Sequence, residues 1–206
     1  MEFCDTIVCG LVQSITFNWA NNIVVSGLTS INSQLSHLVI NSCKNVAVRN
    51  VKIIAPDQSP NTDGIHVQGS TGVTITGSTI GTGDDCISIG PGTRNLWMEH
   101  IKCGPGHGIS IGSLGKDKKE DGVQNVTLTN SVFIGSDNGV SQVTYRNIKG
   151  TSRSQAAMIF NCSSSNPCRG IRLQDINLTY MNKAATSTCR NVHGTRSGVV
   201  VPRSCV

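Results

Sequence analysis

The amino-acid sequence predicts an all-β fold, a single-stranded parallel β-helix (solenoid) that forms one domain over residues 1–206. Composition is the first reason. Only 14% of the residues are charged and 4% are aromatic, 22 are glycine, and the abundant Asn, Ser, Thr, Val and Ile favour short strands joined by tight turns. The second reason is a recurring pattern in which Asn, Gly or once Gln precedes two apolar residues that are separated by one position. No stretch shows the 3.6-residue apolar period of a capped helix, so helices are not expected.

Each copy of the pattern predicts one strand. The copies are residues 22–25, 45–48, 72–75, 95–98, 125–128, 142–145 and 170–173. Their first apolar residues are 23, 27, 23, 30, 17 and 28 residues apart, so six of the seven copies can be coils of a solenoid. Alternating apolar side chains would point inward, and the corner Asn residues would bond to the backbone or to the neighbour above. Local hairpins are the alternative, but the two-residue turns that they require are scarce.

The step of 17 residues between Val126 and Val143 departs from the repeat. Residues 131–134 predict one further strand in this interval, yet 17 residues barely close a coil. We therefore expect either a missing stretch of coils between Val140 and Ser141 or a misassembled coil at this point. Residues 1–14 are also atypical of the repeat.

The cysteines and sequons indicate an oxidising, secretory environment. Nine cysteines without a CxxC pair favour disulfides over a zinc or redox motif. The sequons predict glycosylation at Asn125, Asn161 and Asn177. The chain opens without a basic segment and an apolar segment of adequate length, so no signal peptide is visible and we expect the natural amino terminus to lie upstream. No apolar run is long enough for a membrane span.

Three polar fragments at one interval form the candidate site. They are residues 61–64, 83–86 and 106–108. Asp63 and Asp85 are 22 residues apart, as are Asp85 and His107, and each fragment precedes a similar apolar run. Because stacked coils lie about 4.8 Å apart, we expect the carboxylates and the imidazole to converge on one patch.

Clustered carboxylates suit glycoside hydrolysis, in which one carboxyl group donates a proton and another activates water. Crowding like charges raises at least one pKa, so both protonation states can coexist in one site. His107 would tune that sharing. A cation site formed by Asp63, Asp84, Asp85 and His107 is an alternative, but calcium prefers several oxygen donors, and we expect neither a metal nor a cofactor. The bland alternative is a set of corner-ladder residues. The net charge of +5 fits either a polyanionic partner or a basic surface that keeps the chain soluble.

The same fragments resemble three of the four signature motifs of plant polygalacturonases, the pectin-hydrolysing enzymes of glycoside hydrolase family 28. The matching segments are Asn61-Thr62-Asp63-Gly64-Ile65, Gly83-Asp84-Asp85-Cys86 and the run from Cys103 to Ser113. The similarity extends from about Ile15 to the carboxy terminus. It implies a right-handed parallel β-helix with an open active-site groove on its side. It also implies a secreted cell-wall protein, a monomer that binds pectin but neither nucleic acid nor membrane.

The resemblance implies roles for individual residues. Asp84 would be the general acid, Asp63 and Asp85 would activate the water, and His107 would support the protonation of the acid. The substrate-binding residues would be Asn61, Gly106 and Ser110. The resemblance implies inverting hydrolysis of α-1,4-galacturonan. Spacing does not, because carboxylates one coil apart can lie closer than the roughly 6.5–9.5 Å usual for inverting enzymes.

The fourth family motif, Arg-Ile-Lys after Asn-Gly-Val, is absent. Asn138-Gly139-Val140 is followed by Ser141-Gln142-Val143, so the expected carboxylate clamp and a later Tyr-bearing coil are missing. Arg146 or Lys149 would have to replace the clamp. Three further cations follow His107 and would either attract pectin or form a solvated loop: Lys116, Lys118 and Lys119. Impaired hydrolysis is therefore expected. The alternatives are a catalytically inactive relative or truncated isoform that at most binds pectin, and a calcium-dependent pectate lyase.

The resemblance also implies three disulfides: Cys86 with Cys103, Cys162 with Cys168, and Cys189 with Cys205. Cys4, Cys9 and Cys43 then remain. Because the total is odd, at least one thiol is free or forms an intermolecular bond.

Overall fold

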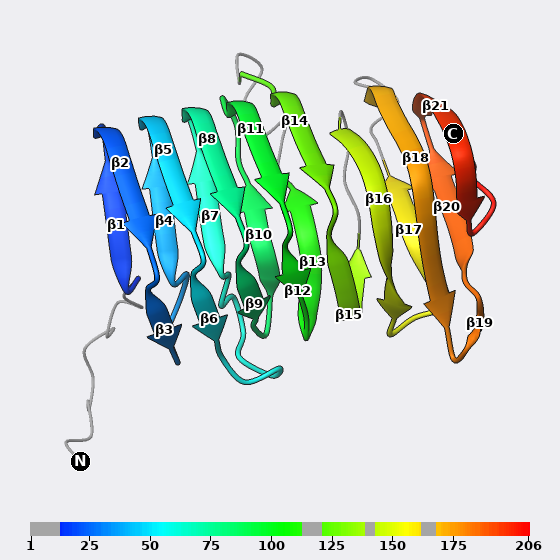
Figure 1. Ribbon diagram of the computed structural model, residues 1–206, viewed down its shortest axis with the longest axis horizontal. Coiled ribbons are helices and arrows are strands. Elements are labelled where there is room, and N and C mark those ends of the chain that lie inside the picture. The colour runs from blue at the N-terminus through cyan, green and yellow to red at the C-terminus, as the bar shows by residue number, and fades with distance from the viewer. Residues whose placement is uncertain (1–12, 113–120, 139–142, 162–167) are drawn as a thin grey trace, which may run out of the picture.

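The chain folds into a right-handed parallel β-helix, as the sequence predicts, and its coils stack along the long axis of Figure 1. The computed structural model describes residues 13–112, 121–138, 143–161 and 168–206. Within these ranges all regular elements are strands, and no helix capable of crossing a membrane is found.

Each complete coil contributes one strand to each of three faces. Face A contains β1 (Ile15–Asn18), β4 (Leu38–Asn41), β7 (Ile65–Gln68), β10 (Asp85–Ile89) and β13 (Gly106–Ile111). Face C contains β3 (Thr29–Ile31), β6 (Lys52–Ile54), β9 (Thr79–Gly81), β12 (Lys102–Cys103) and β15 (Val132–Asn138). All strand pairs within these two faces are parallel.

Face B is the longest of the three. It contains β2 (Asn21–Ser26), β5 (Lys44–Arg49), β8 (Thr71–Thr76), β11 (Arg94–Glu99), β14 (Gln124–Thr129), β16 (Val143–Ser152), β18 (Cys168–Tyr180) and β21 (Val192–Val201). Strands β16 and β18 continue from face B onto face C. Three strands lie outside these stacks: β17 (Ala156–Asn161) pairs with β20 (Thr186–Arg190), and β19 (Lys183–Ala184) turns back antiparallel to β18.

The register on face B is the one that the sequence repeat predicts. The first apolar residues of six successive copies pair directly with one another: Ile23, Val46, Val73, Leu96, Val126 and Val143. Because side chains alternate between the two sides of a strand, this register keeps one apolar column facing the interior of the solenoid.

Asparagine ladders form the corner before face B. Asn22, Asn45, Asn95 and Asn125 all adopt left-handed backbone conformations, with φ between 52° and 57°, which Asn tolerates better than most residues. The Asn45 amide donates to Asn22 Oδ1 at 3.2 Å, and the Asn125 amide donates to Asn95 Oδ1 at 2.6 Å. The corner bonds expected from the sequence are therefore present.

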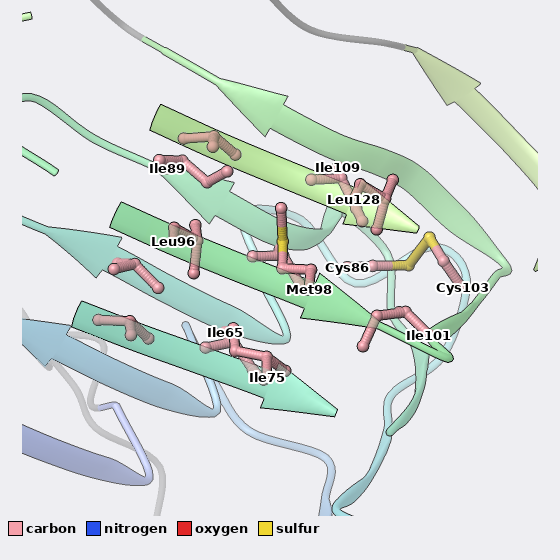
Figure 2. Close-up of a cluster of buried hydrophobic side chains, with 14 of the residues drawn as sticks. Ile65, Ile75, Cys86, Ile89, Leu96, Met98, Ile101, Cys103, Ile109 and Leu128 are labelled. Carbon is pink, nitrogen blue, oxygen red and sulfur yellow. A yellow bond between two sulfur atoms is a disulfide. The ribbon is translucent and has the colours of Figure 1, made fainter. Parts of the chain in front are cut away.

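The interior of the solenoid is a continuous apolar column. Figure 2 shows side chains from successive coils, such as Ile65, Ile75 and Leu96, packed against one another. The Cys86–Cys103 disulfide lies within this column, and a second disulfide joins Cys189 to Cys205. Both bonds are those that the family resemblance implied.

The remaining cysteines differ in what the structure describes. Cys43 is buried and free. Residues 1–12 and 162–167 lie outside the described residues, as does the side chain of Cys168. The expected Cys162–Cys168 bond and the state of Cys4 and Cys9 therefore stay predictions.

Across the 17-residue interval the described strands of face B stay in register, although the sequence alone suggested that 17 residues barely close a coil. Val126 pairs directly with Val143, so face B is uninterrupted. β15 pairs with β12 through Phe133 and with β13 through Asn138. One strand thus serves faces C and A without a turn between them. Residues 139–142, which contain the expected deletion point, lie outside the described residues.

Candidate active site

The predicted site residues meet at the corner where the chain passes from face C to face A. Asp63 lies two residues before β7, Asp84 precedes β10, Asp85 opens β10, and His107 is the second residue of β13. A groove of about 500 Å³ runs along this corner. Its lining includes the three carboxylates, Asp63, Asp84 and Asp85, together with two predicted substrate-binding residues, Asn61 and Ser110.

A bulge in β10 changes the expected vertical order. Ile65, Ile87 and Ile109 stack as predicted, but the register shifts between Asp85 and Ile87, so Asp85 pairs with Gly108. The amide of His107 consequently donates to the Asp84 carbonyl at 2.8 Å. A strict 22-residue step would place His107 above Asp85, but the bulge brings His107 above Asp84 instead.

Asp84 and His107 form the solvent-facing part of the site. His107 Nδ1 lies 3.0 Å from Asp84 Oδ1, and the two side chains are 46% and 24% exposed. Gly106 beside them has a φ of +136°, and a β-carbon at this position would lie 2.6 Å from the Asp84 carbonyl oxygen. Only glycine permits this close approach without strain. Gly106 thus allows its backbone to pass close to the Asp84 carbonyl.

Asp63 lies deeper in the groove. The Ser88 hydroxyl donates to Asp63 Oδ2 at 2.7 Å, and His66 Nδ1 lies 2.8 Å from the same hydroxyl oxygen. Burial raises the pKa of Asp63, and the negative charge of Asp84 adds to that effect. The Ser88 hydrogen bond and the nearby His66 act in the opposite direction and lower the pKa of Asp63.

Asp85 is the carboxyl group that holds a proton most strongly. Burial raises its pKa from an ordinary 3.8 to about 7, and the charges of Asp63 and Asp84 contribute. Ser110 donates a hydrogen bond to Asp85 Oδ1, which opposes the rise in pKa, as does His107. The groove therefore contains a carboxylic acid at mildly acidic pH, as acid–base catalysis requires.

One oxygen each from Asp84 and Asp85 and one ring nitrogen of His107 lie within 4.8 Å of one another. These three donors are a poor match for calcium, which takes six to eight oxygen ligands. An acidic cluster with one imidazole is also what the stacking of three coil ends produces. It carries no metal assignment.

Sequence reasoning missed His66 and Ser88, although a signal was present. His66, Ser88 and Ser110 follow one another at 22-residue steps in the middle of the three apolar runs. Their flanking Ile residues point into the core, so the middle side chains point outward into the groove. The signal for His66 and Ser88 is therefore the 22-residue repeat of these outward-facing polar residues.

The loop that carries Asn61 and Asp63 is anchored from a distant part of the chain. The Arg153 guanidinium pairs with the carboxylate of Asp57 through both terminal nitrogens, one of them at 2.8 Å. Such two-pronged contacts fix geometry as well as charge. Arg153 follows β16, so the coil after the short interval helps to position this loop.

The other candidate cations are not found in the groove among the described residues. Arg146 pairs with Thr129 on face B, and Lys149 pairs with Val132 on face C, whereas the groove follows the start of face A. Lys116, Lys118 and Lys119 lie outside the described residues.

The three sequons differ in their surroundings. Asn125 is exposed, but its amide belongs to the corner ladder. Asn177 is exposed on the part of β18 that lies on face C. The side chain of Asn161 lies outside the described residues. Glycosylation at these positions stays a prediction.

Comparison with known proteins gives a consistent match. The family model described as "Glycosyl hydrolases family 28" matches residues 10–142 and 140–205. A polygalacturonase of Prunus persica is 45% identical over an alignment that covers 94% of this chain and 62% of that protein. A polygalacturonase of Gossypium hirsutum is 36% identical, with 95% and 61% covered. The chain thus spans about three fifths of the length of these relatives.

The solved polygalacturonase of Erwinia carotovora superposes with a TM-score of 0.70 at 24% identity, covering 87% of this chain and 59% of that one. This likeness supports the fold. The sequence alignments add information about length. The alignment with the Prunus protein has 245 positions, but 94% of 206 residues is only about 194, so about 50 positions have no counterpart in this chain. The two segments that match the family model meet at residues 140–142.

Proposed function

Because the chain belongs to glycosyl hydrolase family 28, we propose that it hydrolyses the α-1,4-galacturonan of pectin by acid–base catalysis with inversion. The observation that carries this proposal is the convergence of Asp63, Asp84 and Asp85 on one groove, with His107 in contact with Asp84 and one carboxyl group protonated up to about pH 7. The relatives named polygalacturonase support the substrate class.

In this proposal Asp84 is the general acid. It lies at the solvent-facing part of the site, where a glycosidic oxygen can reach it, and its contact with His107 orients the carboxyl group. Asp63 takes the proton of the attacking water, and Asp85 helps to orient that water. Asn61 and Ser110, which line the groove, contact the sugar.

The proton that Asp84 donates must also have a source within the site. Burial places it on Asp85 in the free site, whereas the acid is Asp84. One carboxyl oxygen of each lies within 4.8 Å of the other. On substrate binding, Asp85 passes its proton to Asp84, and Asp84 gives it to the leaving oxygen as the glycosidic bond breaks. Water then bonds to the anomeric carbon and releases its own proton to Asp63.

We further propose that turnover is reduced by the missing cationic clamp. About 50 positions of the relatives have no counterpart, and the family match divides at residues 140–142, where Arg-Ile-Lys is expected. A hydrogen bond to a charged group contributes about 1.5–3 kcal/mol. Losing one such contact in the transition state would therefore slow the reaction by roughly 10- to 150-fold.

Secretion to the cell wall and a monomeric state complete the proposal. The two disulfides support an extracellular location, since disulfides persist in oxidising compartments. Exposed Asn177 is the sequon best placed for modification.

The test is incubation of the purified chain with polygalacturonate. We expect reducing ends to appear slowly, without ultraviolet absorbance from an unsaturated product, and we expect Asp84→Asn to abolish them. Absorbing products would indicate a lyase and would refute hydrolysis. Pectin binding without reducing ends would favour the second candidate, a non-catalytic β-helix that binds pectin. The division of the family match at residues 140–142 is the observation that favours this candidate.

A further inference from the structure

The Ser88 hydroxyl connects two titratable groups that sequence motifs did not link. It donates to Asp63 Oδ2 at 2.7 Å and lies 2.8 Å from His66 Nδ1. Ser88 is only 6% exposed, and both contacts are part-buried. His66 lines the groove and is partly exposed, which leaves its ring in contact with solvent.

Counting donors fixes two arrangements of this chain of contacts. A serine hydroxyl has one proton. When Ser88 donates to an ionised Asp63, His66 Nδ1 must carry the proton that points toward Ser88. When Asp63 is protonated and donates to Ser88, the hydroxyl turns and donates to an unprotonated Nδ1. The two arrangements differ by the passage of one proton from Asp63 to His66, and no heavy atom needs to move.

Gln68 favours the direction of this transfer. Its carbonyl Oε1 lies 3.2 Å from His66 Nε2 and accepts the Nε2 hydrogen in the arrangement that has a protonated Asp63. The lone pair of Nδ1 then faces Ser88 and is ready to accept a proton. The outer hydrogen bond of a histidine ring sets its tautomer in this way.

We propose that Ser88 and His66 form a proton relay that removes the proton from Asp63 during catalysis. This inference rests on the proposed function, in which Asp63 takes a proton from the attacking water. Asp63 passes that proton to Ser88 Oγ while Ser88 passes its own to His66 Nδ1. The imidazolium then releases one proton to solvent through the groove, and the carboxylate of Asp63 is restored. Ser88 and His66 are thus positioning and relay residues, and neither needs to touch the sugar.

The neighbouring residues provide a matched comparison. Ser110 donates to Asp85 as Ser88 donates to Asp63, but the residue stacked against Ser110 is Ser88 and not a histidine. Asp85 therefore has no histidine in the stacked position that His66 occupies below Ser88. The titratable groups that interact with Asp63 are Asp84 and Asp85 from the next coil and His66 from its own coil. From the preceding coil, His37 contacts Asp63 through its backbone N–H, which donates to the Asp63 carbonyl at 2.9 Å.

The test follows Asp63 and His66 directly by NMR, using carboxyl ¹³C and ring ¹⁵N shifts over a pH titration of the full chain. In the unmodified chain we expect the same titration step to appear in both residues. Ser88→Ala should separate the two titrations, and Ser88→Thr, which keeps the hydroxyl, should restore their coupling. Ser110→Ala should leave the coupling intact. Joint titration that persists in Ser88→Ala would overturn the relay.

Kinetics give a second readout. Ser88→Ala and His66→Gln should each lower kcat roughly tenfold or more with little change in KM, because the relay moves a proton and does not bind sugar. An unchanged kcat in both variants would overturn the relay. If the unmodified chain produces no reducing ends, the proposed function fails, and the NMR titration still decides whether the relay exists.

Discussion

Replacing Asp85 by asparagine should stabilise the fold while it removes catalysis. Burial raises the pKa of Asp85 from 3.8 to about 7, so the folded chain holds a proton there that the unfolded chain releases. Between about pH 4 and pH 7 the free energy of unfolding therefore falls as the pH rises. The full rise in pKa corresponds to about 4 kcal/mol at pH 8. Asp85→Asn removes this cost, and the asparagine carbonyl can still accept the Ser110 hydrogen bond.

Urea unfolding of the two chains at pH 4, 6 and 8 measures the effect. We expect similar stability at pH 4 and a gain for Asp85→Asn that approaches about 4 kcal/mol at pH 8, or roughly 10 °C in Tm for a chain of this size. Asp121→Asn is the matched control, because the Asp121 side chain is 73% exposed and its ion pair with Arg94 is long at 3.5 Å. If the gain in unfolding free energy is the same at all three pH values, it does not come from the raised pKa of Asp85.

Three further predictions concern activity and stability. The value of kcat/KM on polygalacturonate should fall above about pH 7, because the proton shared by Asp85 is then lost; a profile that stays flat to pH 9 would contradict the shared proton. Gly64→Ala should cost about 1–3 kcal/mol of unfolding free energy in a urea titration, because a β-carbon would overlap the Cys86 carbonyl oxygen, whereas Gly112→Ala beside the groove meets no atom within 4 Å and should be neutral. Replacing Cys86 and Cys103 together by alanine should lower the free energy of unfolding by about 3 kcal/mol, as expected for a 17-residue separation, and an unchanged urea midpoint would count against a stabilising role.

The face B register was predictable because it depends on local chemistry that recurs. One apolar column and one asparagine corner suffice to align Ile23, Val46 and Val73, since a slip of one residue would turn the apolar side chains outward. The Cys86–Cys103 and Cys189–Cys205 bonds were also anticipated, but from family resemblance and not from residue spacing.

Other features depend on three-dimensional detail that a repeat does not encode. The bulge between Asp85 and Ile87 places His107 beside Asp84 and not above Asp85. The 22-residue spacing does not predict this bulge. Between Val126 and Val143, β15 pairs both with β12 on face C and with β13 on face A, and an apolar cavity of about 60 Å³ is lined by residues such as Phe133 and Tyr145. Such adjustments arise from packing between coils and are not visible in one strand.

In the proposed mechanism, carboxyl groups on neighbouring coils direct water onto galacturonan. The most direct measurement is proton NMR of the first sugar ends released from polygalacturonate, recorded before the anomers equilibrate. Because Asp63 is proposed to activate water on the face opposite to the bond broken by Asp84, we expect β-anomers from the α-linked substrate. First-formed α-anomers, or products with an unsaturated ring, would contradict it.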